Sequence, residues 1–233
     1  MKNFKTLLIF LSVFYCTVYV SAQTPKFVVS AEFAVTGNEL FNHFMKAPDV
    51  KYGYGISNAA TIQYNFSKHF SIKSGIAFDT KRMHEILPLD FSCPYNIFCV
   101  FNYEKYGYTH QLNYIKTPLL IQTSFGKRFQ FFIDAGVYFS GLFASSYAAD
   151  YYAVSESSNL KVQNTYKPYD FGVIWGVGIK IPIGKNFSIP FELRANRSLV
   201  DQMSDIYPHT SGFKIHTRDI TIGLSYSFNG LKK

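Results

Sequence analysis

The chain has 233 residues, of which 18% are aromatic and 16% charged, and its mean hydropathy is close to zero. These values exclude a disordered chain, which would be poor in apolar residues, and a helical membrane protein, which would be more hydrophobic. The formal charge of +8 is spread along alternating segments instead of forming a basic patch, so we expect no nucleic-acid partner. The 24 Phe and 18 Tyr residues, together with many β-branched residues, favour strands over helices.

Residues 1–22 have the features of a secretory signal peptide. Lys2 and Lys5 form a basic start, residues 7–20 form an apolar stretch, and residues 20–22 provide a small-residue cleavage site. A membrane anchor is the alternative, but the apolar stretch is short and polar residues interrupt it. We therefore expect an exported protein in which the signal is removed and residues 23–233 form a single domain.

After residue 23 the sequence alternates apolar and polar residues with a period of two, which predicts β-strands. Residues 169–183 show this pattern most clearly, since Phe171, Trp175 and Val177 lie on one face and Asp170 lies on the other. We predict eight strands, which cover residues 27–36, 55–66, 70–79, 111–125, 129–142, 169–183, 187–196 and 218–228.

The connections between the predicted strands alternate in length. Tight turns occur at residues 67–69, 126–128 and 184–186, whereas long loops join the other neighbours. An even number of strands with short periplasmic turns and long extracellular loops is typical of outer-membrane barrels. The predicted fold class is therefore all-β, an eight-stranded antiparallel transmembrane β-barrel with short periplasmic turns and long extracellular loops.

A soluble eight-stranded barrel of lipocalin type is the main alternative, because it alternates in the same way with its apolar residues inside. The interior of eight strands has room for side chains of modest size, whereas the apolar face of this chain is rich in Phe, Ile and Tyr and includes Trp175. We therefore expect these side chains to face lipid and lipopolysaccharide in the bacterial outer membrane. The aromatic residues beside the short turns, which we expect to form an interfacial girdle, are Tyr64, Phe66, Phe70, Phe125, Phe129, Phe187, Tyr226 and Phe228.

Three motifs resemble the PorT-like outer-membrane β-barrel domain family. They are YIKTPLL at residues 114–120, DAG at residues 134–136, and YDFG followed by GVG within residues 169–178. The resemblance implies an eight-stranded outer-membrane barrel that is inserted by the barrel assembly machinery. Some members of the family are linked to protein secretion, so the resemblance also implies possible envelope or secretion partners.

The polar face of the predicted strands carries six acidic and five basic residues. Because buried charges are tolerated only when they are paired, this near balance indicates a closed, salt-bridged lumen, with a narrow porin-like channel for small solutes as the alternative. Glycines within residues 172–178 would leave room for long neighbours such as Lys116 or Arg194, and Pro118 predicts irregular pairing in mid-strand. The predicted lumen charge network consists of Glu32, Lys73, Asp79, Lys81, Lys116, Asp134, Asp170, Lys180, Glu192, Arg194 and Asp219.

The sequence contains no motif that indicates catalysis. No serine lies in a Gly-x-Ser-x-Gly motif, and the six histidines lack the spacing of a metal site. We therefore expect no catalytic residue, cofactor or metal, and a hydrolase or acyltransferase at the barrel rim is the least favoured alternative. The expected function is that of a small outer-membrane barrel that acts through its surface loops or as an accessory to an envelope or secretion machine.

Two cysteines, Cys93 and Cys99, remain after removal of the signal peptide. Export to an oxidising compartment favours a disulfide over a metal pair, and Pro94 and Asn96 supply turn chemistry between the two cysteines. Closing this short ring would create an apolar tip on the loop. The candidate loop binding surface consists of Tyr95, Ile97 and Phe98.

We predict that Cys93 and Cys99 are joined in the native protein. Mass spectrometry of non-reduced, alkylated protein from fresh membranes should show both cysteines protected from alkylation. Replacing both by Ser should change the stability of the barrel little, because a short ring removes little chain entropy from the unfolded state. Two alkylated cysteines in untreated protein would contradict the prediction.

Overall fold

The structure is a computed structural model that describes residues 27–42, 50–51, 53–87, 106–126, 129–151, 158–160, 166–202 and 213–228. The predicted signal peptide lies outside these residues. So do the predicted disulfide partners Cys93 and Cys99 and the candidate loop surface of Tyr95, Ile97 and Phe98, all of which stay predictions.

The described residues form eight long strands and two short ones. No helix among them has the length and hydropathy needed to cross a membrane. The eight long strands coincide with the eight predicted ones, and several extend further at the end opposite the short turns. The elements are β1 (Phe27–Asn42), β2 (Val50–Lys51), β3 (Gly53–Asn65), β4 (Phe70–Leu87), β5 (Tyr106–Phe125), β6 (Gln130–Tyr151), β7 (Ser158–Leu160), β8 (Tyr169–Pro182), β9 (Phe187–Ser198) and β10 (Phe213–Phe228).

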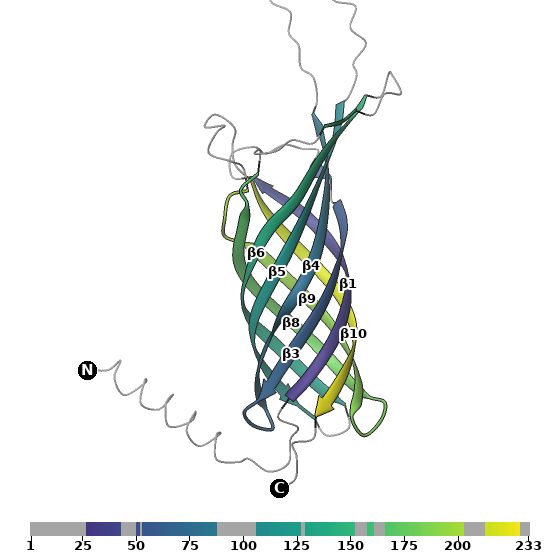
Figure 1. Cartoon of the computed structure of the whole chain (residues 1–233), viewed down its shortest axis with the longest axis vertical. Coiled ribbons are helices and arrows are strands. Elements are labelled where there is room, and N and C mark those ends of the chain that lie inside the picture. Colours follow the sequence, from purple (N-terminus) through teal and green to yellow (C-terminus); the bar gives the residue numbers. More distant parts are fainter. Residues whose placement is uncertain are drawn as a thin grey trace, which may run out of the picture.

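The eight long strands close into an antiparallel barrel (Figure 1). Each long strand pairs with its neighbours in the chain, and β1 closes the ring by pairing with β10 along its whole length, from Phe27 opposite Phe228 to Asn42 opposite Phe213. The short strands β2 and β7 add to β4 and β6. Closure leaves no open sheet edge among the long strands, and it confirms the predicted fold class.

The two ends of the barrel differ in their connections. Residues 66–69, 126–129 and 183–186 join strands at the end where β1 begins and β10 ends, and much longer segments join strands at the other end. Since short turns mark the periplasmic side of outer-membrane barrels, the start of β1 and the end of β10 both lie on that side.

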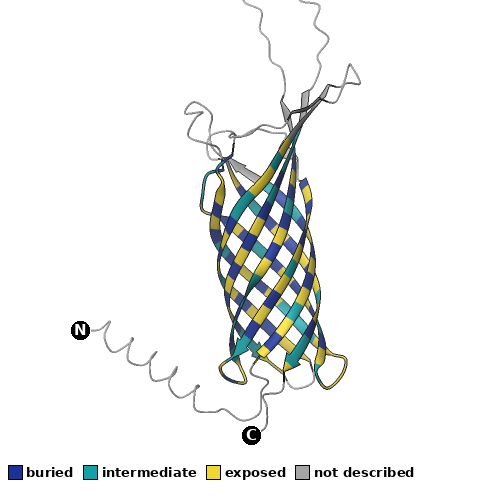
Figure 2. Cartoon of the chain, viewed as in Figure 1, coloured by how far each residue is buried: buried dark blue, intermediate teal, exposed yellow. Residues whose placement is uncertain are grey.

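The outer wall of the barrel is apolar and the inner wall is polar. Figure 2 shows the result as alternating exposed and buried positions along every long strand. Trp175 and Phe139 are about half exposed, at 48% and 56%, whereas the charged Asp170 is fully buried inside. This arrangement is the inverse of a soluble barrel, so the outer wall must contact lipid.

Aromatic side chains gather at the periplasmic end, as predicted for an interfacial girdle. Phe27 and Tyr64 lie 5.1 Å apart between ring centroids, and Tyr226 lies 5.0 Å from both Phe187 and Phe228. These edge-on and tilted pairs link β3, β1, β10 and β9 around part of the barrel.

The lumen also contains large apolar and aromatic side chains, although we expected the interior of eight strands to hold only side chains of modest size. Tyr114, Leu120, Tyr138 and Ile174 all point inward and are at most 2% exposed. The expectation that only modest side chains fit inside was therefore wrong, although the outward direction of the larger apolar set is confirmed.

Three inward-facing glycines of β8 make this crowding possible. A methyl group at any of them would lie within 3.0 Å of a neighbouring side chain. The nearest side chains are two aromatic rings and a carboxylate, and Arg194, one of the two predicted long neighbours, lies opposite Gly176 in the strand register. The contacts are Gly172 with Tyr138, Gly176 with Glu192, and Gly178 with Phe132.

Pro118 interrupts one strand ladder, in agreement with the predicted irregular pairing. The pairs of β4 and β5 omit residues 75–76 opposite residues 117–118, because proline has no N–H to donate. The Ser74 hydroxyl donates a hydrogen bond of 2.9 Å to the Pro118 carbonyl oxygen, which satisfies that acceptor.

Trp175 should contact lipid. Because it is the only tryptophan of the chain, the tryptophan fluorescence of the protein comes from this position alone. Brominated phospholipids should quench its fluorescence in the reconstituted protein, most strongly with bromine near the bilayer centre, because Trp175 lies in the middle of β8. A Trp175→Phe, Ile181→Trp variant places the probe near the periplasmic end and should respond to shallower bromines. Absence of quenching by all brominated lipids would place the outer face of β8 inside the barrel.

Candidate functional site

The eleven charged residues assigned to the lumen all lie on inward-facing positions of the long strands. Ten of them are buried, and Lys180, close to the periplasmic end, is partly exposed. Most of these residues form ion pairs, in two groups separated along the barrel axis. The lumen is therefore the most highly organised polar region among the described residues.

The first group contains four charges in the periplasmic half of the lumen. Lys73 Nζ lies 2.6 Å from Glu32 Oε1 and 3.7 Å from Glu192 Oε2. Arg194 bridges the same two carboxylates, at 3.3 Å from Glu32 and 2.7 Å from Glu192. The Thr61 hydroxyl adds a hydrogen bond of 3.1 Å to Glu32. We call these four residues, Glu32, Lys73, Glu192 and Arg194, the four-charge cluster.

The four-charge cluster spans the lumen. Lys73 comes from β4, Glu32 from β1, and Glu192 and Arg194 from β9, and β4 and β9 lie on opposite sides of the ring of strands. Two cations and two anions balance, and each side chain meets both members of the opposite sign. The cluster is thus a charge-neutral crosslink between opposite walls of the barrel.

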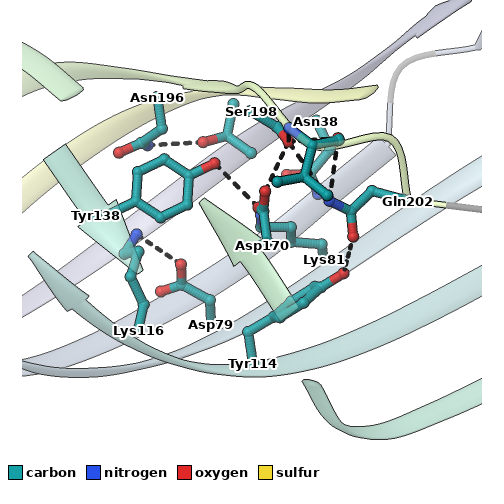
Figure 3. A network of polar contacts seen from close by, with 12 residues as sticks. Asn38, Asp79, Lys81, Tyr114, Lys116, Tyr138, Asp170, Asn196, Ser198 and Gln202 are labelled. Atoms are coloured by element: carbon teal, nitrogen blue, oxygen red, sulfur yellow. Dashed lines mark hydrogen bonds and ion pairs between the residues drawn. The ribbon is translucent and has the colours of Figure 1, made fainter. Parts of the chain in front are cut away.

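The second group lies nearer the extracellular end and contains two ion pairs (Figure 3). Lys116 Nζ lies 2.6 Å from Asp79 Oδ2, and Ser57 donates a further hydrogen bond to the same carboxylate. Lys81 Nζ lies 3.4 Å from Asp170 Oδ2.

Asp170, which lies on β8, accepts hydrogen bonds from side chains of three other strands, β4, β6 and β9. The Tyr138 hydroxyl donates at 3.0 Å and the Ser198 hydroxyl at 2.6 Å, alongside the Lys81 ammonium. Figure 3 shows these side chains converging on one carboxylate across the lumen. Because several donors share this acceptor, the charge of Asp170 is well compensated.

Three of the eleven predicted residues form no ion pair with the described residues. Asp219 instead accepts a hydrogen bond of 2.6 Å from the Asn196 amide. Lys180 donates at 3.4 Å to the Gln63 amide oxygen, and Asp134 lies opposite Gln122 in the strand register. The charge network is therefore two separate groups with three outlying members, and not one continuous chain of pairs.

Loop residues close the extracellular mouth of the lumen, which the sequence did not indicate. Gln202, just after β9, is fully buried. Its side-chain amide oxygen accepts a hydrogen bond of 2.8 Å from the Tyr114 hydroxyl, and its backbone carbonyl oxygen accepts one of 2.9 Å from the Lys167 backbone N–H. Tyr166 is 7% exposed and its hydroxyl bonds to His110. Strand alternation carries no information on residues that fold inward from loops, so no pattern could have found this cap.

A layer of apolar side chains, which includes Tyr166 itself, packs at the same mouth of the lumen. Tyr114 of this layer contacts both Gln202 and Lys81, and Gln202 also reaches Asp170 through the Ser198 hydroxyl. The layer consists of Met83, Leu112, Tyr114, Tyr166 and Ile215, with Leu142 packed against it.

The histidines among the described residues make local contacts. His84 lies 3.0 Å from the Thr109 hydroxyl, and His69 lies 2.9 Å from the Ser124 carbonyl oxygen. Within the described part of the chain, no three His, Cys, Asp or Glu residues come together in a way that could hold a metal ion.

Comparison with known proteins places this geometry in context. The model of the family described as outer membrane protein beta-barrel domain matches residues 21–203. Among solved structures, Neisserial surface protein A is 10% identical, with 89% of this chain and all of that chain covered and a TM-score of 0.46. OprG from Pseudomonas aeruginosa is also 10% identical (90% and 99% covered, TM-score 0.45), and Ail of Yersinia pestis is 11% identical (85% and 98% covered, TM-score 0.41). A search of curated proteins finds no match.

Removing one member of the four-charge cluster should destabilise the barrel. Lys73→Met leaves Glu32 and Glu192 with a single cation, and loss of one partner from a buried ion pair costs about 3 kcal/mol or more. Denaturant unfolding of the protein in phospholipid vesicles measures this cost, and the double variant Lys73→Met, Glu32→Gln should recover part of it.

The exposed pair of Arg218 and Glu39 provides the matched control. Their side chains are 79% and 37% exposed and lie 3.2 Å apart on the outer wall. Arg218→Gln should change the free energy of unfolding by less than about 1 kcal/mol, because water and salt screen exposed pairs. Equal effects of Lys73→Met and Arg218→Gln would show that the cluster does not crosslink the barrel.

Proposed function

We propose that this chain, which belongs to the outer membrane protein beta-barrel domain family and lies in the bacterial outer membrane, has a closed and charge-paired lumen. The role of the protein is then carried by its extracellular loops or by its attachment to an envelope or secretion machine. The observation that supports this proposal is the combination of an ion-paired lumen with a cap over its extracellular mouth.

The ion pairs support a closed lumen because eight of the eleven lumen charges are already held by an opposite charge. The four-charge cluster extends from β4 to β9 through the middle of the barrel, so a solute would have to separate Lys73 or Arg194 from a carboxylate to pass. Breaking buried pairs is costly, and the same residues that would line a channel are held in place by one another.

The cap supports the same conclusion at the extracellular mouth. Gln202 and Tyr166 fold inward and pack with apolar side chains, where an open channel would present hydrated polar groups. A narrow porin-like channel is the alternative, and a hydrolase or acyltransferase at the rim is less favoured because the sequence contains no nucleophile motif.

The outer wall near the extracellular end carries a cationic patch that fits the phosphate groups of lipopolysaccharide. Arg197 lies directly opposite His216 in the register of β9 and β10, and Lys214 and Arg218 flank His216 on the same face. Arg197, Lys214 and Arg218 are exposed, and because Glu39 is the acidic side chain that pairs with Arg218 there, the patch keeps a net positive charge. The barrel assembly machinery is the other partner that a protein of this family requires for insertion.

Planar-bilayer recording tests the closed lumen. The refolded protein should give no stable conductance steps above the background of the bilayer, whereas a general porin treated in the same way should give discrete openings. The variant Arg194→Ala removes one crosslink of the four-charge cluster and should remain closed, because the apolar layer at the extracellular mouth is intact. Reproducible steps in the unmodified protein, altered in size by Arg194→Ala, would instead establish the narrow channel.

A further inference from the structure

A cavity of about 210 Å³ lies at the periplasmic mouth of the lumen, at the end opposite the cap. It is bounded by the inward-facing ends of the strands and by the short turns after β3 and β8. At roughly 30 Å³ for each water molecule, it has room for a small ligand with part of its hydration shell.

The lining of this cavity is cationic. Lys68, Lys180 and Lys185 all contribute to it, and none of the described lining residues is an Asp or a Glu. The remaining polar lining consists of hydroxyl and amide side chains, which can donate hydrogen bonds to an oxyanion. A cleft lined by one sign of charge attracts ligands of the opposite sign.

Lys180 differs from the other lumen cations because no carboxylate of the described residues pairs with it. Lys73, Lys81, Lys116 and Arg194 each contact an acidic side chain, whereas Lys180 reaches across the lumen from β8 to the neutral amide of Gln63 on β3. Its ammonium lies 6.0 Å from the Phe132 ring centroid. A confined ammonium that lacks an anionic partner is a strong attractor for an anion.

The position of the cavity determines where the ligand comes from. The four-charge cluster lies further along the lumen, since Glu192 follows the cavity-lining Ser188 on β9 and Thr61 precedes Gln63 on β3. The cavity faces the periplasmic side, because its lining includes residues 67–68 and 184–186 of the short turns. Lys68 and Lys185 are exposed on the turns that surround its entrance.

We propose that the periplasmic mouth of the lumen is a binding site for a phosphate group, with Lys180 at its base and Lys68 and Lys185 at its rim. The phosphate comes either from a free phosphate compound of the periplasm or from the headgroup of an anionic phospholipid in the inner leaflet. The site is independent of any role of the extracellular loops.

Calorimetric titration with inorganic phosphate tests the site in the refolded protein, in an uncharged detergent and a chloride background. Lys180→Gln should weaken binding about tenfold or more, since hydrogen bonds to charged groups contribute strongly, and Lys180→Arg should retain most of it. Lys214→Gln is the matched control, because it removes the same charge from the outer wall at the opposite end of the barrel. Retained heat-modifiable migration on gels confirms that each variant is folded.

A second measurement distinguishes the two sources of phosphate. Native mass spectrometry of protein from vesicles of phosphatidylcholine with phosphatidylglycerol should show retained phosphatidylglycerol, which Lys180→Gln removes, if the ligand is a lipid headgroup. Saturable binding of inorganic phosphate that depends on Lys180 supports the site with a free ligand, and Lys180-dependent lipid retention supports it with a lipid. If neither phosphate binding nor lipid retention depends on Lys180, the proposal is wrong.

Discussion

Eight strands that close on themselves enclose an interior just wide enough for side chains to fill, and this lack of room governs the chemistry of the lumen. A charged side chain that points inward cannot keep a full hydration shell, so an opposite charge or several hydrogen-bond donors within the same cross-section lower the cost of its burial. Lys73 and Arg194 meet this requirement by sharing Glu32 and Glu192, and Asp170 meets it with three donors. The same contacts that neutralise the charges also connect opposite walls of the barrel.

Packing and charge pairing in the lumen depend on one another. The aromatic rings of Tyr138 and Phe132 occupy space left by Gly172 and Gly178, and Glu192 occupies space left by Gly176. The Tyr138 hydroxyl then donates to Asp170, so a ring that fills volume also completes a polar contact. A larger residue in place of Gly172 or Gly176 would therefore disturb both the packing and a charge.

The two mouths of the lumen are chemically unlike. At the extracellular side an apolar layer and the buried Gln202 pack against the ion pairs, and Gln202 reaches Asp170 through the Ser198 hydroxyl. At the periplasmic side a cavity lined by three lysines remains beneath the short turns. The extracellular end is thus suited to contacts made by its outer surface, whereas the periplasmic end is suited to receive a small anion.

The alternation of the sequence alone determined the strand number, the antiparallel barrel and the inward direction of residues such as Glu32 and Lys73, because side-chain direction in a strand is a local property with a period of two. Tertiary structure alone decided which charges meet. Arg194 and Glu32 are 162 residues apart and come from strands that are not neighbours, so their contact depends on the tilt and stagger of the whole barrel. The inward fold of Gln202 and the pairing of Gly172 with Tyr138 likewise result from distances across a closed lumen, which no periodicity along one strand encodes.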